Sequence, residues 1–296
     1  MNAGYRDKAS VMTSVSEAPM KPTAASALPD RLWTRVLKSK PVQSFRTPIM
    51  VTASLLVFFA LWQFLSYFVF NPYLIPPPTQ VVATAIPMIQ SGEIFSHAGI
   101  SLLRVLVGFS LGSAAAIVVG VIMGRLRVVN ELLDPVIEFL RYLSPTAMIP
   151  IAVIWFGIGE QSKYFLIFWG TFFFVLINTI AGVLRTPVAR QRAAQCLGAN
   201  QLQIFLIVVI PSAIPYIITG MRVAMASSFM SIIPAEMLAA QSGIGYMLQV
   251  SGMLAQTDRI FVALAVISLL GFLTDRLFRF LVHRTLNRYM TFVSVS

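Results

Sequence analysis

Long apolar stretches, separated by shorter polar segments, recur along this 296-residue sequence. The hydrocarbon core of a bilayer is about 30 Å thick and a helix rises about 1.5 Å per residue, so a spanning helix needs about 20 apolar residues. We therefore predict an all-α, polytopic membrane protein with six transmembrane helices. The predicted spans are Ile49–Phe70, Ser101–Met123, Pro135–Phe156, Tyr164–Leu184, Val209–Ile233 and Ile260–Val282.

The composition favours a membrane domain over soluble domains. Hydrophobic residues make up 57% of the chain and charged residues 11%, whereas a soluble domain carries roughly 25% charged residues. The single cysteine, Cys196, has no partner for an intrachain disulfide, and no Cys/His cluster has metal-ligand spacing. We expect no metal site and no catalytic residue; His97 and His283 lie near predicted helix ends and are expected to be free histidines.

A polar head precedes the first apolar stretch. That stretch is too long for the apolar region of a signal peptide and lies too far from the N-terminus, so we do not expect it to be cleaved. Residues 1–46 are rich in Ser, Ala, Pro and Lys and are predicted to form a cytoplasmic head that is disordered or loosely attached. Residues 47–285 are predicted to form the transmembrane domain, and residues 286–296 a cytoplasmic tail.

Lysine and arginine residues alternate in number between the two sides of the predicted spans. The head has eight, residues 71–100 have none, and the later loops continue to alternate between rich and poor. Because cytoplasmic loops carry an excess of these residues, both termini are predicted to lie in the cytoplasm. The net charge of +11 thus reflects topology. No basic patch is interleaved with aromatic residues, which argues against nucleic-acid binding.

Small residues recur at every fourth position of the second predicted span. In a helix this spacing forms one stripe, which lets a neighbouring helix approach closely. Tight packing within the bundle is the simpler interpretation, and a surface that slides or flexes is the alternative. The stripe consists of Gly108, Gly112, Ala116, Gly120 and Gly124.

The segment between the first two spans is predicted to contain a short surface helix. Prolines at positions 72 and 76–78 end the first span. Thr79 is a candidate cap for an amphipathic helix near Gln80–Gln90. We expect this helix to rest on the outer boundary between membrane and water.

Polar residues inside membrane spans are costly and often mark a pathway. The two arginines among them suit an anionic solute, although pairing with carboxylates or helix ends, as structural struts, is the alternative. No buried carboxylate pair or His-Asp chain is apparent, which disfavours a proton-coupled transporter, and unconnected Ser, His and Asp residues disfavour a hydrolase. The candidate pathway residues are Arg141, Ser144, Asn178, Arg222, Ser228 and Glu236.

The polar loop between the fourth and fifth spans has the pattern of a helix-turn-helix. The run Arg192–Leu197 is a good helix former, and Gly198 permits a sharp turn. Gln201–Val209 can form a second short helix that leads into the fifth span at Pro211. Such a hairpin is typical of a docking element, and a plain connector is the alternative.

The loop, residues 187–211, resembles the EAA loop of permease subunits in binding-protein-dependent ABC importers. That pattern reads E-A-A, three residues, G, nine residues and then I-x-L-P. Arg192 occupies the glutamate position and departs from the pattern. The matching residues are Ala193, Ala194, Gly198 and Pro211, with Val208 and Ile210 as conservative replacements.

Further stretches within residues 70–285 resemble the sulfonate, taurine and nitrate branch of that family. Several spaced motifs in one order make this resemblance more specific than the loop alone. The stretches are Leu140–Pro145, Trp155–Glu160, Pro215–Arg222, Ala235–Leu238 with Gly243–Gly245, and Thr274–Arg276.

The resemblance implies an ABC importer type I permease of the MetI-like fold, a transport subunit rather than an enzyme. Such permeases work as a pair, expected here to be a homodimer, with two cytoplasmic ABC ATPase subunits and a periplasmic or lipid-anchored solute-binding protein. The expected location is the bacterial inner membrane. The chain has no G-x-x-x-x-G-K-[ST] phosphate loop, so ATP and Mg²⁺ are expected on the ATPase and no cofactor on this chain.

The branch implies a small organic or inorganic anion as substrate, such as a sulfonate, taurine, nitrate or an aromatic acid. Arg192 either meets a compensating acid on the ATPase or points to solvent while the loop docks through Ala193, Ala194 and Leu197. A secondary transporter or channel without an ATPase partner is the alternative function, and a membrane scaffold is a third possibility. Only generic hydrophobicity supports the secondary transporter or channel.

Overall fold

The computed structural model describes the backbone of residues 40–290 and the side chains of residues 50–238 and 240–285. Every regular element within residues 40–290 is helical, which confirms the all-α prediction. The chain divides into two units, Met1–Ala60 and Leu61–Ser296. Most of the predicted head, residues 1–39, and the end of the predicted tail, residues 291–296, lie outside the described residues.

In the first unit, the described residues belong to one long helix, α2 (Lys40–Phe68). The side chains of residues 51–60 are all exposed, and most of them are apolar. The part of α2 from Met50 to Phe68 is long and apolar enough to cross a membrane. An exposed apolar surface of this length suits hydrocarbon rather than water.

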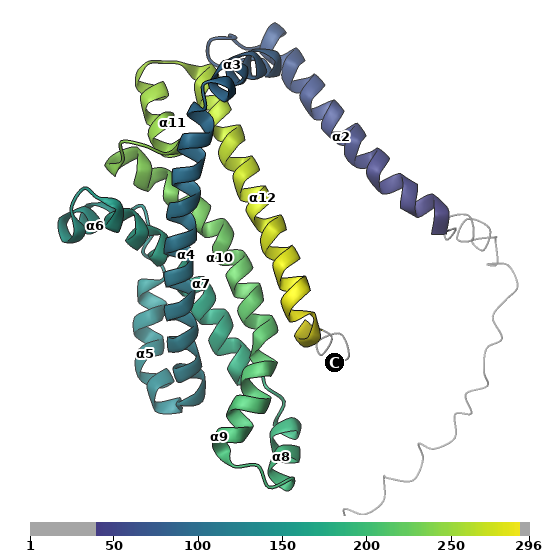
Figure 1. Cartoon of the computed structure of the whole chain (residues 1–296), viewed down its shortest axis with the longest axis vertical. Coiled ribbons are helices and arrows are strands. Elements are labelled where there is room, and N and C mark those ends of the chain that lie inside the picture. Colours follow the sequence, from purple (N-terminus) through teal and green to yellow (C-terminus); the bar gives the residue numbers. More distant parts are fainter. Residues whose placement is uncertain (1–39, 291–296) are drawn as a thin grey trace, which may run out of the picture. The chain divides into compact units, whose positions relative to one another are not determined.

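Four long helices form the bundle of the second unit: α4 (Glu93–Arg125), α7 (Glu160–Leu184), α10 (Ile210–Ala239) and α12 (Thr257–Met290). Helix α7 packs extensively along both α4 and α10 (Figure 1). These helices correspond to the second, fourth, fifth and sixth predicted spans. With α2, they make five helices within residues 40–290 that are long and apolar enough to span a membrane.

The stripe of small residues on α4 lies against α7. A Cβ atom added to Gly108 would lie 2.6 Å from Cβ of Ile167, closer than real Cβ atoms approach. The facing residues on α7 also recur at every fourth position, so two helical rows meet along the contact. The same relation joins Gly112 to Thr171, Gly120 to Thr179 and Gly124 to Val183, and Ala116 in the same row is fully buried.

The third predicted span, Pro135–Phe156, is not one continuous helix. It is divided between α5 (Arg127–Leu140) and α6 (Ile149–Phe156), which a turn around Pro145 connects. Proline lacks an N–H donor and disfavours helical geometry at the preceding residue, so the helix ends before Ser144 and Pro145. The third predicted span therefore consists of two shorter helices rather than one membrane-spanning helix.

Two short helices, α3 (Pro78–Gln90) and α11 (Ile244–Met253), lie at one end of the bundle and pack against α12 (Figure 1). Helix α3 confirms the predicted surface helix, but the prediction of Thr79 as its cap is wrong. Pro77 occupies the cap position, because Pro78 already adopts helical geometry, and no side chain caps the helix. Thr79 instead accepts a hydrogen bond from Gln63 (3.3 Å).

The opposite end of the bundle bears a hairpin that connects α7 to α10 (Figure 1). It consists of α8 (Val188–Cys196), α9 (Gln201–Ile204) and a π-helical turn, η1 (Phe205–Val209), which continues directly into α10. The predicted helix-turn-helix is thereby confirmed, with a second helix that is shorter than expected because it changes into the π-helical turn at Phe205.

Candidate functional site

The hairpin is held in shape by two local motifs. Helix α8 is followed by Gly198, whose φ of +82° lies in the left-handed region that glycine adopts without strain. Helix α9 then begins with a capping box. The side chain of Asn200 accepts from the N–H of Gln203 (2.8 Å), and the side chain of Gln203 accepts from the N–H of Asn200 (2.8 Å). The order of the hairpin therefore comes mainly from the backbone geometry at Gly198 and from a capping box within the hairpin itself.

Most of the predicted docking residues on the hairpin are accessible. Leu197, at its tip, is 89% exposed. Arg192 and Ala193 are exposed, and Ala194 is half-buried. Within the described residues Arg192 has no ion-pair partner. The hairpin thus offers a small apolar surface with an uncompensated cation beside it.

A cavity of about 1060 Å³ separates α8 from the start of α10. On the η1 turn, the ring of Phe205 lies 4.4 Å from the guanidinium carbon of Arg125, which is the last residue of α4. This distance fits a cation–π contact. The hairpin is therefore connected to α10 through the chain and to α4 through this contact. Residues lining the cavity include Arg185, Arg190, Ala193, Ala194, Leu197 and Pro211.

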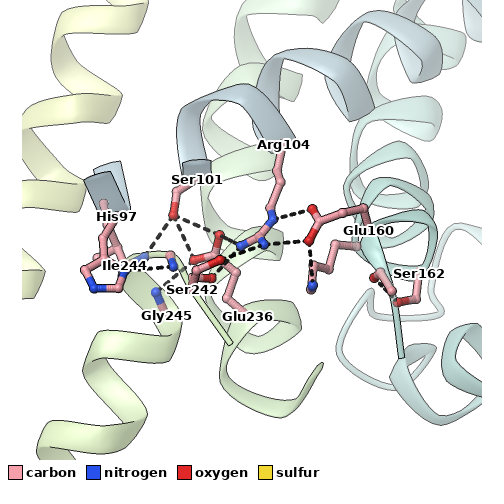
Figure 2. Close-up of polar contacts among 12 residues, drawn as sticks. His97, Ser101, Arg104, Glu160, Ser162, Glu236, Ser242, Ile244 and Gly245 are labelled. Carbon is pink, nitrogen blue, oxygen red and sulfur yellow. Dashed lines mark hydrogen bonds and ion pairs between the residues drawn. The ribbon is translucent and has the colours of Figure 1, made fainter. Parts of the chain in front are cut away.

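An ion network that is buried except at Glu160 connects α4, α7 and α10 beside the start of α11 (Figure 2). Arg104 of α4 is 2% exposed and forms a two-pronged ion pair with Glu160 of α7, with distances of 2.6 Å and 2.7 Å. Its Nη1 also lies 2.7 Å from Glu236 of α10 and 2.6 Å from the carbonyl oxygen of Ser242. Lys163 donates to Glu160 (2.9 Å). Two cations thus balance two carboxylates. The side chain of Glu160 is 48% exposed, whereas Arg104, Lys163 and Glu236 are buried, and this pairing makes their burial tolerable.

The second carboxylate of the network, Glu236, also caps the short helix α11. Its Oε2 accepts a hydrogen bond from the N–H of Gly245 (2.9 Å). The hydroxyl of Ser101 lies 2.8 Å from both carboxylate oxygens and accepts from the N–H of Ile244 (2.9 Å). The first N–H groups of a helix lack acceptors within that helix. For α11, side chains of α4 and α10 act as these acceptors.

Gly243 completes this arrangement. Its φ is +115°, and a Cβ atom added there would collide with the carboxylate of Glu236. Its N–H donates to Nδ1 of His97 (3.0 Å). The expectation that His97 is a free histidine is therefore wrong, because the close approach of the α11 backbone gives it a partner.

Glu236 is one of the predicted pathway residues, whereas Ser101, Arg104 and Glu160 are not among the predicted site residues. The structure buries Glu236 completely and uses its carboxylate for ion pairing and capping. A signal for Arg104 existed: an arginine inside the apolar span Ser101–Met123 requires a partner. The identity of that partner was not visible, since Glu160 lies 56 positions further along the chain.

The two predicted pathway arginines lie in different cavities. Arg141 and Ser144 line a cavity of about 390 Å³ beside the turn between α5 and α6. Arg222 lines a cavity of about 440 Å³ between α10 and α12, where its Nε lies 3.4 Å from the carboxylate of Asp275. Arg141 also has a carboxylate partner, Glu138, at 3.1 Å.

The remaining predicted pathway residues form hydrogen bonds within the bundle. The hydroxyl of Ser228 is buried and lies 2.8 Å from that of Thr171. The side-chain amide of Asn178 donates to the carbonyl oxygen of Phe174 (2.8 Å). Of the six predicted pathway residues, Arg141 and Ser144 thus line one cavity together, and Arg222 lines a different one.

Comparison with known proteins agrees with this architecture. The family model described as the binding-protein-dependent transport system inner membrane component matches residues 116–287. A putative ABC transporter permease protein of Methanocaldococcus jannaschii is 38% identical over 226 residues, which cover 75% of this chain and 85% of that protein. The taurine transport system permease protein TauC of Escherichia coli is 32% identical over 251 residues, covering 83% and 91%. The nitrate import permease protein NrtB of a Synechocystis strain is 32% identical over 216 residues, covering 70% and 78%.

Among solved structures, a chain of the MetNI methionine ABC transporter, in inward-facing conformations, has a TM-score of 0.52. It is 19% identical to this chain and covers 66% of this chain and 97% of its own length, so the likeness is one of fold. This confirms the predicted MetI-like permease fold. The sequence relatives support a permease rather than a secondary transporter or channel. The chain therefore belongs to the family of binding-protein-dependent transport system inner membrane components, the multi-pass permease subunits of ABC importers.

Proposed function

We propose that this permease forms, with a second copy of itself, the membrane pathway of an importer for a small organic or inorganic anion, driven by two separate ABC ATPase subunits. The substrate class follows from the taurine and nitrate permeases among its relatives. A solute-binding protein, periplasmic or lipid-anchored, delivers the anion, and the ATPase binds ATP and Mg²⁺.

The hairpin is the observation on which this proposal rests. It projects from the bundle and exposes a leucine at its tip. Its turn is fixed by Gly198 and the capping box, so it is pre-shaped for a partner. Through η1 and Arg125 it connects to α10 and α4, so displacement of the docked hairpin reaches two of the long helices.

The hairpin end then faces the cytoplasm of a bacterial cell, and the end with α3 and α11 faces the periplasm. The alternation of basic residues along the sequence supports this orientation. Both termini are on the cytoplasmic side in this arrangement of the inner membrane.

Isolation of the tagged full chain from its native membrane tests the proposal. An ABC ATPase subunit should be isolated with it, and the complex in liposomes should take up anion only when ATP and the binding protein are supplied. Leu197→Asp should lower the amount of bound ATPase, whereas Arg127→Gln, an exposed substitution on α5, should not. Isolation of the chain without an ATPase, with uptake driven by an ion gradient alone, would refute the proposal.

A substitution at Arg192 distinguishes docking through the apolar residues of the hairpin from docking through an ion pair between Arg192 and the ATPase. We infer that the hairpin docks mainly through Ala193, Ala194 and Leu197, because Arg192 is exposed and unpaired within the described residues. Arg192→Glu should then leave ATPase binding and uptake unchanged. A large loss of both would instead indicate a compensating acid on the ATPase.

A further inference from the structure

The cavity beside the turn between α5 and α6 has two chemically different sides. One side is the turn itself, with Arg141, Ser144 and Thr146. The other side is formed by α7 and α10 and is mainly apolar; it includes Trp169, Phe173, Phe174 and Met230. The volume of about 390 Å³ lies in the range of small-molecule sites.

The polar side retains unused hydrogen-bond donors. A guanidinium has five N–H groups. The hydrogen bonds that Arg141 makes, to Glu138 (3.1 Å) and to the hydroxyl of Tyr142 (3.0 Å), both use Nη2. Nε and Nη1 thus keep their N–H groups within the described residues. Ser144 acts only as an acceptor, from the N–H of Thr146 (3.3 Å), so its hydroxyl proton also stays available.

The apolar side has a few polar groups that already have hydrogen-bond partners within the protein. Its two serines already donate their protons to backbone carbonyls: Ser227 to Gly170 (2.9 Å) and Ser231 to Ser227 (2.8 Å). The indole of Trp169 donates to the carbonyl oxygen of Leu143 (3.0 Å) and thereby attaches the turn to α7. The cavity is therefore preformed, and its aromatic wall is satisfied without a polar ligand.

We propose that this cavity is a binding site for an organic anion, which places its carboxylate or sulfonate against Arg141 and Ser144 and its hydrocarbon body against Trp169 and Phe173. An anionic head matches the free donors, since a charge-assisted hydrogen bond to a guanidinium is stronger than a neutral one. An apolar body removes water from the aromatic wall, which a small inorganic anion does not. The membrane subunit thus contributes its own substrate selection. This inference rests on the proposed function, in which an anion crosses the pathway.

Titration of the purified permease–ATPase complex with benzenesulfonate, nitrate and benzyl alcohol tests the site, with tryptophan fluorescence as the signal. Benzenesulfonate should bind at least about tenfold more tightly than either of the other two probes. Trp169→Phe should remove the signal. Arg141→Gln should weaken benzenesulfonate binding about tenfold to a hundredfold. Arg127→Gln, at the other end of α5, is the matched control and should change nothing.

Equal binding of benzyl alcohol and benzenesulfonate would overturn the proposal, because it would reveal an apolar crevice only. Unchanged binding to Arg141→Gln in a complex that still contains the ATPase would overturn it as well. If the Arg141→Gln variant fails to assemble with the ATPase, the double variant Ser144→Ala, Thr146→Val tests the site instead. It should weaken the binding of benzenesulfonate but not that of benzyl alcohol. Absence of an ATPase partner, with Arg141-dependent binding retained, would refute the proposed function and leave this site standing.

Discussion

The two ends of the bundle differ in whether their charged side chains are buried and paired or exposed and unpaired. At the end with α3 and α11, Arg104 and Glu236 are buried, and each charge has a partner on another helix. At the hairpin end, Arg192 and Leu197 are exposed, and the order comes from backbone geometry and a local capping box. One end is held by long-range pairs, and the other by contacts between near neighbours in the sequence.

This difference predicts which end moves. Breaking a buried ion pair by removing one partner costs about 3–5 kcal/mol, whereas loss of a helix cap costs about 1 kcal/mol. The network therefore resists separation of α4, α7 and α10, while the hairpin can shift at little cost. An importer permease needs both properties, because a stiff bundle transmits the displacement of a docked element.

The largest effect is expected when the network loses its shared cation. Arg104→Met leaves Glu236 buried without a counter-charge, so the free energy of unfolding should fall by about 3–5 kcal/mol. Denaturant unfolding in detergent micelles measures this. Arg127→Met, which removes an exposed pair with Glu131, should change it by less than about 1 kcal/mol. Addition of Glu236→Gln to Arg104→Met should recover part of the loss; if it does not, packing rather than charge holds this end.

A smaller effect is expected along the contact that joins the two ends. Gly108→Ala places a Cβ atom 2.6 Å from Cβ of Ile167, and overpacking of this kind costs about 1–3 kcal/mol. Gly99→Ala, in the same helix, meets nothing within 4 Å and should be neutral or stabilising by up to about 1 kcal/mol. The same unfolding measurement compares the two. Similar results for both would contradict close packing of α4 on α7.

At the hairpin the expected effect is local. Gly198→Ala forces a side chain into the left-handed region at a cost of about 1–2 kcal/mol, although its Cβ atom meets nothing within 4 Å. Amide hydrogen exchange of residues 188–204 should become about 5- to 30-fold faster, with α4 and α7 unchanged. Gly159→Ala, at φ −145° and also without neighbours, is the control. Faster exchange throughout α7 would show that the hairpin and the bundle unfold together.

The smallest effect is expected at Arg222. Its pair with Asp275 is partly exposed, so Arg222→Ala should lower the free energy of unfolding by no more than about 1 kcal/mol. Uptake and unfolding should be measured on the same preparation. A stability loss as large as that of Arg104→Met would make Arg222 a structural strut, whereas a loss of uptake alone would place it on the pathway.

Much of the fold was predictable because a membrane imposes a length on each apolar helix. The hairpin was predictable because its signals are local: the alanines before Gly198 favour a helix, and Gly198 permits the sharp turn that ends it. The break at Pro145 was less predictable, because a proline can also lie inside a membrane-spanning helix and the apolar stretch around it is long enough to span a bilayer. The helix ends before Pro145 because proline lacks an N–H donor and disfavours helical geometry at the preceding residue.

The ion network could not be predicted in full. Arg104 pairs with residues 56 and 132 positions away, and only the packing of α4 on α7 and α10 brings them together. The cavity at Arg141 was found only in part for the same reason. Its aromatic wall comes from α7, and those aromatic residues look like ordinary lipid-facing or core residues when the sequence is considered alone.

The turn η1 contains one residue more than an α-helical turn of the same rise requires. Each residue advances an α-helix by about 100° around its axis. That extra residue therefore sets the angular phase between the hairpin and α10. Deletion of one residue from Phe205–Val209 would rotate the hairpin by about 100° while the α4–α7 contact remained in place. The direction in which the hairpin faces relative to α10 therefore depends on a residue count, whereas the shape of the hairpin itself depends on Gly198 and the capping box.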